Sequence, residues 1–192
     1  MKDNFKISDK EVLDARNTIF KDYGIPELEK NGYVKSPFKT SWFGQYDSNI
    51  RGYSYELCKL TNQNQLHFIN ASMLKGEKRI KISLNIFELN EKLNSLDDLK
   101  DCDGINFKLP PNDLTIMELR YDDYKGPPVF HILFLPWHKL GNIKSKSSFE
   151  KEVRKLRDLV KKDMDNIDSF EKRWHELHKP NITDKEGNVI KK

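Results

Sequence analysis

The stretch Arg79-Ile80-Lys81-Ile82-Ser83-Leu84-Asn85-Ile86-Phe87 decides the fold of this chain. Apolar and polar side chains alternate along it. The apolar ones share one face of an extended strand (Ile80, Ile82, Leu84 and Ile86), and the polar ones share the other (Lys81, Ser83 and Asn85). A period of two residues over this length is typical of a half-buried strand in an antiparallel sheet. The sequence therefore predicts a sheet with one apolar face.

Two further stretches, residues 51–60 and 65–74, alternate in the same way before this strand. The loops at 61–64 and 75–78 are too short to join parallel strands, and Gly76 can supply a left-handed turn position. We therefore expect an antiparallel meander over residues 51–88. A second hairpin, formed by residues 114–121 and 129–135, completes a sheet of about five strands.

Helical patterns occupy both ends of the chain. Ser8 and Glu11 form a capping box before an apolar stripe that we expect to stop at Gly24. Apolar residues on a four-three repeat fill 149–177, as one long helix or as two helices broken near Asp168. Leucines spaced four and three apart predict helical turns over 88–100, and residues 33–50 read as a short strand or an extended cover.

These elements predict an α+β fold in which N-terminal and long C-terminal helices cover the sheet. We expect a sheet domain over 1–140 and a C-terminal helical segment over 141–192 that packs on it. Gly141 to Lys146 reads as a linker, and Ser147 and Glu150 read as a second capping box. The polar tail from residue 181 is expected to be mobile.

Composition narrows the class of protein. The chain has 192 residues, of which 36% are hydrophobic and 33% are charged, and it contains 11 Phe, 7 Tyr and 3 Trp. This aromatic content argues against a disordered chain. Two cysteines and no signal peptide favour a cytoplasmic protein, and no apolar run is long enough to span a membrane. The net charge of +4 does not by itself require a nucleic-acid partner.

The first functional hypothesis is a non-enzymatic binding protein that acts through a macromolecular partner, namely another protein. The sequence contains no nucleophile elbow, no phosphate-binding loop and no dinucleotide fingerprint, so we expect no cofactor and assign no catalytic residue. The 149–177 stripe leaves the oligomeric state open, as monomer or dimer, because it suits either a coiled-coil seam or packing on the sheet.

The alternative is a nucleic-acid-binding protein. A basic helix over 147–162 could contact phosphates, and an aromatic cluster over 42–55 could stack on bases. The residues that carry this hypothesis are Trp42, Arg51, Tyr53, Tyr55, Arg154, Lys155 and Arg157. It requires the basic helix and the aromatic cluster to lie on the same surface.

A second alternative is a metal-dependent hydrolase or nuclease. His175 and His178 lie three residues apart and would need His138 or a carboxylate as a third metal ligand. Glu118-Leu119-Arg120 in a strand, with Asp103 and Asp113 upstream, is the related nuclease-like pattern. Arginine replaces lysine poorly in such a pattern because it does not lose its proton.

Overall fold

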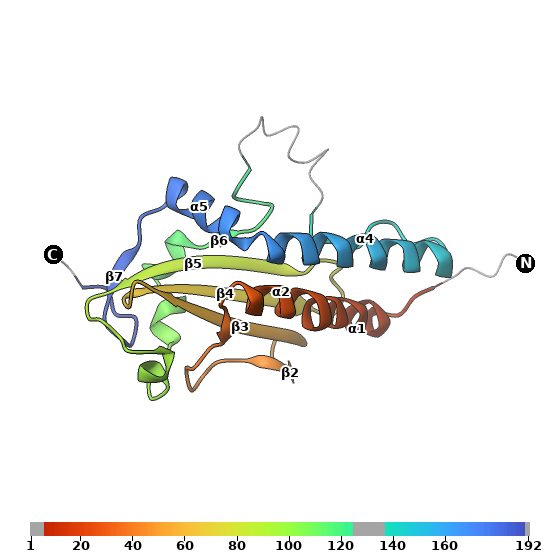
Figure 1. The fold of residues 1–192 in the computed structure, drawn as a ribbon. Coiled ribbons are helices and arrows are strands. Elements are labelled where there is room, and N and C mark those ends of the chain that lie inside the picture. The colour runs from red at the N-terminus through yellow and green to blue at the C-terminus, as the bar shows by residue number, and fades with distance from the viewer. Residues whose placement is uncertain (1–5, 125–136, 191–192) are drawn as a thin grey trace, which may run out of the picture.

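The computed structural model describes residues 6–124 and 137–190, and the predicted meander lies at its centre (Figure 1). Strands β3 (Gly52–Thr61), β4 (Gln65–Leu74) and β5 (Lys81–Leu89) pair antiparallel in sequence order. Asn62, Gln63 and Gly76 adopt positive φ angles in the two connecting loops. The antiparallel meander over 51–88 is therefore confirmed.

Four shorter strands extend this sheet to seven strands within the described residues. Strands β1 (Val34–Lys35) and β2 (Phe43–Asp47) both pair with β3. Strand β6 (Met117–Glu118) pairs antiparallel with β5, and β7 (Asn181–Thr183) pairs parallel with it. The expected hairpin partner at 129–135 lies outside the described residues.

Helices from both ends of the chain cover one face of the sheet, as predicted (Figure 1). Helix α1 (Asp9–Ile19) continues through a π-helical turn (Phe20–Gly24) into α2 (Ile25–Lys30). Helices α4 (Lys146–Asp165) and α5 (Ile167–Leu177) lie beside them and meet at Asn166, close to the predicted break. The fold is α+β.

Each face of the sheet has its own core. The larger core packs the sheet against the helices, and the six buried residues that α4 and α5 contribute are Leu156, Val160, Met164, Ile167, Phe170 and Trp174. Among the described residues, the apolar stripe predicted over 149–177 therefore packs mainly on the sheet. On the other face, β3, β4 and β5 meet a smaller cluster that includes Phe38, Leu99 and Phe107.

The cover of the second face consists of 3₁₀ turns at Leu96–Leu99, Ile105–Lys108 and Asn112–Thr115. Buried Asn112 holds this cover in place. Its side-chain Nδ2 donates to the carbonyls of Asn106 and Gly187, and its own carbonyl accepts from Asn85 on β5. One amide residue thus joins the loop, the sheet and the C-terminal segment.

Four local predictions are wrong. Residues 88–100 form a 3₁₀ turn at Leu96–Leu99 rather than longer helical turns, because the amides of Asn90 and Leu93 bond to Thr183 and Gln63. Gly24 lies within continuous helical structure instead of ending it. It has no side chain, which lets Phe20 and Val160 approach closely.

The other two corrections concern the C-terminal segment. The N-cap of α4 is Ser145, two residues before the predicted cap Ser147, because Ser145 and Ser148 form the capping box. The tail expected to be mobile from residue 181 instead forms β7. Its backbone pairs with β5, and the side chain of Thr183 is fully buried.

Candidate functional site

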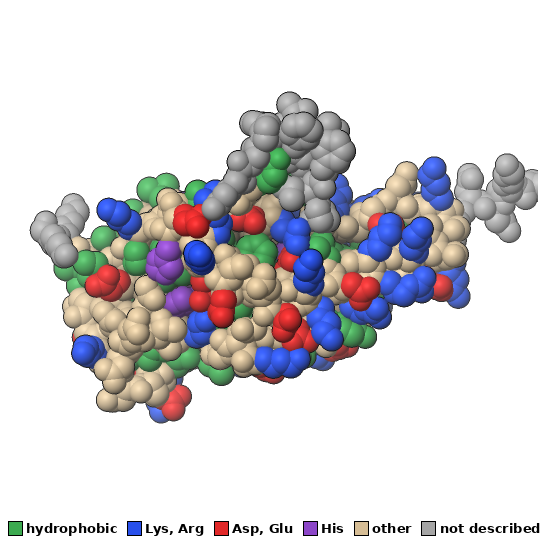
Figure 2. Space-filling model, turned by 45° about the horizontal axis from the view of Figure 1, so that its top comes forward, with side chains coloured by type: hydrophobic (Ala, Val, Ile, Leu, Met, Phe, Trp, Pro, Cys, Tyr) green, Lys and Arg blue, Asp and Glu red, His purple; other side chains and the backbone are tan. Residues whose placement is uncertain are grey.

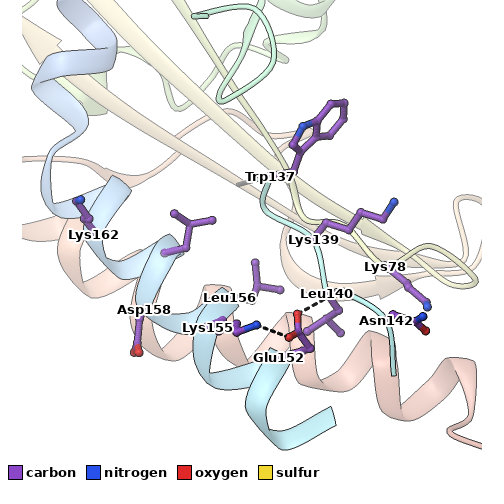
Figure 3. A pocket seen from close by; sticks show the side chains of 12 residues that line it. Lys78, Trp137, Lys139, Leu140, Asn142, Glu152, Lys155, Leu156, Asp158 and Lys162 are labelled. Carbon is purple, nitrogen blue, oxygen red and sulfur yellow. Dashed lines mark hydrogen bonds and ion pairs between the residues drawn. The ribbon is translucent and has the colours of Figure 1, made fainter. Parts of the chain in front are cut away.

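A groove runs between α4 and the segment 137–142 that leads into it (Figure 3). It has a volume of about 1130 Å³. The segment is held against the edge of the sheet, because the amide of Ile80 donates to the carbonyl of His138 and the amide of Leu140 donates to that of Lys78. The groove is therefore built from the loop before β5, this segment and one face of α4.

Apolar side chains form a large part of the groove lining. Leu156 and Leu159 come from α4, and Leu140 and Trp137 come from the facing segment. Leu140 and Leu156 are buried and continue into the main core. A ligand that enters the groove would meet the half-buried Leu159 and Trp137, with Leu140 and Leu156 packed behind the surface.

Four lysines surround this apolar surface: Lys78, Lys139, Lys155 and Lys162. Lys155 contacts Glu152 at 2.6 Å, and Glu152 also accepts from the amide of Gly141 at 3.0 Å (Figure 3). These contacts, with Lys155 first, lower the pKa of Glu152, which therefore stays ionised.

Three of these lysines carry no ion pair with any residue in the described ranges: Lys78, Lys139 and Lys162. The remaining acidic residue of the lining, Asp158, pairs with Arg157 on the same helix at 2.8 Å. The groove therefore combines an apolar surface with unmatched positive charge. Figure 2 shows the lysines and arginines over the helical layer, where acidic side chains are interspersed.

Next to the groove, a buried ionic cluster joins three separate parts of the chain. Asp163 on α4 accepts two hydrogen bonds from Arg120 and lies 2.7 Å from Nε2 of His138. Burial opposes ionisation of Asp163, but Arg120 and His138 lower its pKa overall. The adjoining cavity has a volume of only about 10 Å³, the size of one water molecule. The cluster serves as a structural link between β6 and α4.

A second cluster attaches α5 to the sheet. Oε1 of Glu171 accepts from the hydroxyl of Tyr33 at 2.7 Å and lies 2.6 Å from Nζ of Lys59. Nδ1 of His67 lies 3.3 Å from the same oxygen. Burial on its own would raise the pKa of Glu171, but His67, Lys59 and Tyr33 together lower it to about 2.

The predicted metal residues are not assembled into a site within the described chain. No group of three or more His, Cys, Asp or Glu residues there has an arrangement that could hold a metal ion. The rings of His175 and His178 pack against Trp174, with centroid distances of 5.3 and 5.4 Å. His138 is committed to Asp163, and Glu118 bonds to Arg79 at 3.1 Å.

The structure separates the residues of the nucleic-acid hypothesis. Trp42 is exposed beside β2, whereas Tyr55 is buried in the main core and donates to Asn17. Arg51 and Tyr53 lie at the β2–β3 end of the sheet, and α1 lies between this region and α4 (Figure 1).

The three basic residues of that hypothesis also diverge along α4. Lys155 lines the groove, and Arg154 is exposed. The guanidinium of Arg157 instead lies over the ring of Tyr23, at 5.4 Å. Sequence reasoning missed Lys78, Lys139 and Lys162 as groove residues.

None of the helices in the described residues is long and apolar enough to cross a lipid bilayer. Comparisons of this chain with protein-family models, curated proteins and solved structures give no match.

Proposed function

We propose that this protein is a non-enzymatic binding protein whose groove takes an acidic, partly apolar segment of another protein. The observation that carries the proposal is the lining of the groove, in which unmatched lysines surround leucines and a tryptophan. Apolar side chains of the partner would be buried against Leu159 and Trp137, which are half-buried in the free protein. Its carboxylates would meet Lys78, Lys139 and Lys162, so the charges are complementary.

The size of the groove also suits a peptide segment. Its α4 wall runs from Glu152 to Lys162, and ten residues of helix span about 15 Å. The volume exceeds that of most small-molecule pockets, which reach about 1000 Å³. An amphipathic helix of two to three turns would match this wall, and so would an extended segment of about the same length.

A nucleic-acid partner is the alternative, because Trp137 could stack on a base and lysines bind phosphates. The protein partner is favoured because apolar side chains, Leu159 among them, form a large part of the lining, and a phosphate backbone offers no apolar group to pack on them.

The experiment measures fluorescence anisotropy of a labelled helical peptide made of Leu and Glu, with the leucines on one face. We expect micromolar binding that weakens as salt is added, since exposed charges are screened. The charge reversal K139E/K162E should weaken binding at least about tenfold, and L159Q should weaken it at both low and high salt.

The matched control is K92E/K100E, which changes the net charge equally at exposed positions in the loop after β5 that do not line the groove. It should leave the affinity within about twofold of wild type. Equal losses in both double variants would show that only net charge matters and would overturn the groove as the site. Binding of single-stranded oligo-dT in place of the peptide would favour the nucleic-acid alternative.

A further inference from the structure

A second cavity lies on the opposite face of the sheet from the helices. It has a volume of about 290 Å³, at the lower end of the range for small-molecule sites. Its floor consists of side chains that β4 and β5 direct to this face, in three cross-strand pairs: Phe68 with Asn85, Asn70 with Ser83, and Ser72 with Lys81. Phe107, Lys108 and Ile116 come from the covering turns and form its walls.

The cavity changes in character along its length. At one end, Phe68 and Phe107 belong to the smaller core, and both rings pack against Phe38. In the middle lie Asn70 and Ser83. The hydroxyl of Ser83 has no hydrogen-bond partner among the described residues, although the residue is only 9% exposed. A ligand would therefore meet an aromatic end and then a free hydroxyl.

Two lysines also line the cavity: Lys81 at the other end, and Lys108 beside the middle, where its partner Glu56 lies opposite Asn70. Lys108 pairs with Glu56 at 2.7 Å, and Lys81 lies 3.5 Å from Glu118. The carboxylates lie deeper than the ammonium groups: the side chains of Glu56 and Glu118 are 3% and 15% exposed, against 33% for Lys108 and 45% for Lys81. Each ammonium group has three donors. A group that arrives from solvent thus meets N–H donors before it meets any carboxylate.

We infer that this cavity binds a small organic carboxylate with an apolar, ring-sized body. The body would lie against Phe68 and Phe107, and the carboxylate would accept hydrogen bonds from Ser83 and from the ammonium group of Lys81 or Lys108. Charge-assisted hydrogen bonds of this kind are stronger than neutral ones. The site is independent of the groove on α4, because the sheet separates them.

Calorimetric titration with phenylacetate tests the inference, and its neutral analogue phenylacetamide serves as the ligand control. We expect saturable binding of one phenylacetate per chain and at least about fivefold weaker binding of the amide. S83L fills the cavity and should abolish binding. K81M should weaken binding about threefold to tenfold, while Glu118 keeps Arg79 as a partner. K75M, in the exposed loop before β5, should bind like wild type.

Thermal unfolding of each variant shows whether the fold is kept. If S83L does not fold, K81M still tests the inference independently. Absence of saturable binding at about 10 mM phenylacetate would overturn the inference, because a ligand of this size with ordinary efficiency would occupy a real site at that concentration. Equal binding of phenylacetamide, or unchanged binding to a folded S83L variant, would overturn it as well.

Discussion

At the scale of single residues, Arg16, Asp163 and Glu171 are charged side chains whose partners cannot be predicted from spacing in the sequence. Arg16 on α1 is fully buried, and its guanidinium donates to the carbonyls of Leu74 and Arg79 at the β4–β5 turn. Burial lowers the pKa of Arg16 to about 10. In the sequence, Arg16 reads as an ordinary surface residue of an amphipathic helix. Its partners are backbone oxygens about sixty residues away, and only the folded chain brings them together.

For Asp163, the sequence predicts that a partner exists but does not identify it. It interrupts the apolar stripe of the C-terminal helices, so a charged partner can be expected for it. Its partners, Arg120 and His138, lie in segments without regular spacing, and the sequence therefore does not identify them.

Glu171 makes a residue-scale prediction about pH. Its pKa is about 2 in the folded protein and about 4.5 in an unfolded chain. A lowered pKa means that the folded state binds the proton less well, so Glu171 stabilises the protein fully above pH 4.5 and loses this effect as the pH falls toward 2. We expect E171Q to lower the free energy of unfolding by about 2 kcal/mol at neutral pH, after allowance for partial exposure.

The measurement is urea denaturation at several pH values between neutral and acid. The difference between wild type and E171Q should shrink as the pH falls through this window. E150Q, a substitution at an exposed glutamate in the second turn of α4, serves as the control and should have a pH-independent effect below about 0.5 kcal/mol. A constant difference between E171Q and wild type at all pH values would contradict the assignment.

At the scale of elements, long alternating patterns predict structure well and short ones do not. The meander was predictable because β3, β4 and β5 are nine or ten residues long and one face of each contributes to the main core. Strand β7 has only three residues, and its place is set by backbone pairing with β5 and by Asn112. The 3₁₀ turns at Ile105–Lys108 and Asn112–Thr115 are likewise held by distant hydrogen bonds, from Asn106 to Asn188 and from Asn112 to Gly187, which leave no period in the sequence.

At the start of α4, the capping box predicts different effects on stability for substitutions of two neighbouring serines. Ser145 accepts from the amide of Ser148, whereas Ser147 lies inside the first turn. Replacement of a capping serine by alanine costs about 1 kcal/mol, because a helix amide loses its acceptor. S145A should therefore lower the free energy of unfolding by about this amount in a denaturant titration, and S147A should change it by less than about 0.5 kcal/mol. A larger effect of S147A than of S145A would instead support Ser147 as the cap, as the sequence predicts.

At the scale of the whole molecule, the sheet separates two surfaces of different chemistry. The helices bury one face and leave a lysine-lined groove at its edge, while short turns cover the other face and leave the smaller cavity. Of the groove, the sequence predicted only the basic character of α4, which includes Lys155 and Lys162. Lys78 precedes β5 and Lys139 precedes α4, so their meeting depends on how β5 and the 137–142 segment lie together.

The main core contains residues from both segments, 1–140 and 141–192, and this predicts that the two fold together. The sheet buries Ile69, Ile82 and Leu84 against Val160 and Trp174, among others, so neither segment can bury its apolar face alone. We expect the fragment 1–140 to lack the near-ultraviolet circular dichroism of the intact chain and to regain it when mixed with the fragment 141–192. The intact chain should unfold in one cooperative transition. Removal of residues 191–192 alone serves as the control and should leave the transition unchanged. A fragment 1–140 that folds and unfolds cooperatively by itself would show two independent units, and the shared core would then be an interface between domains.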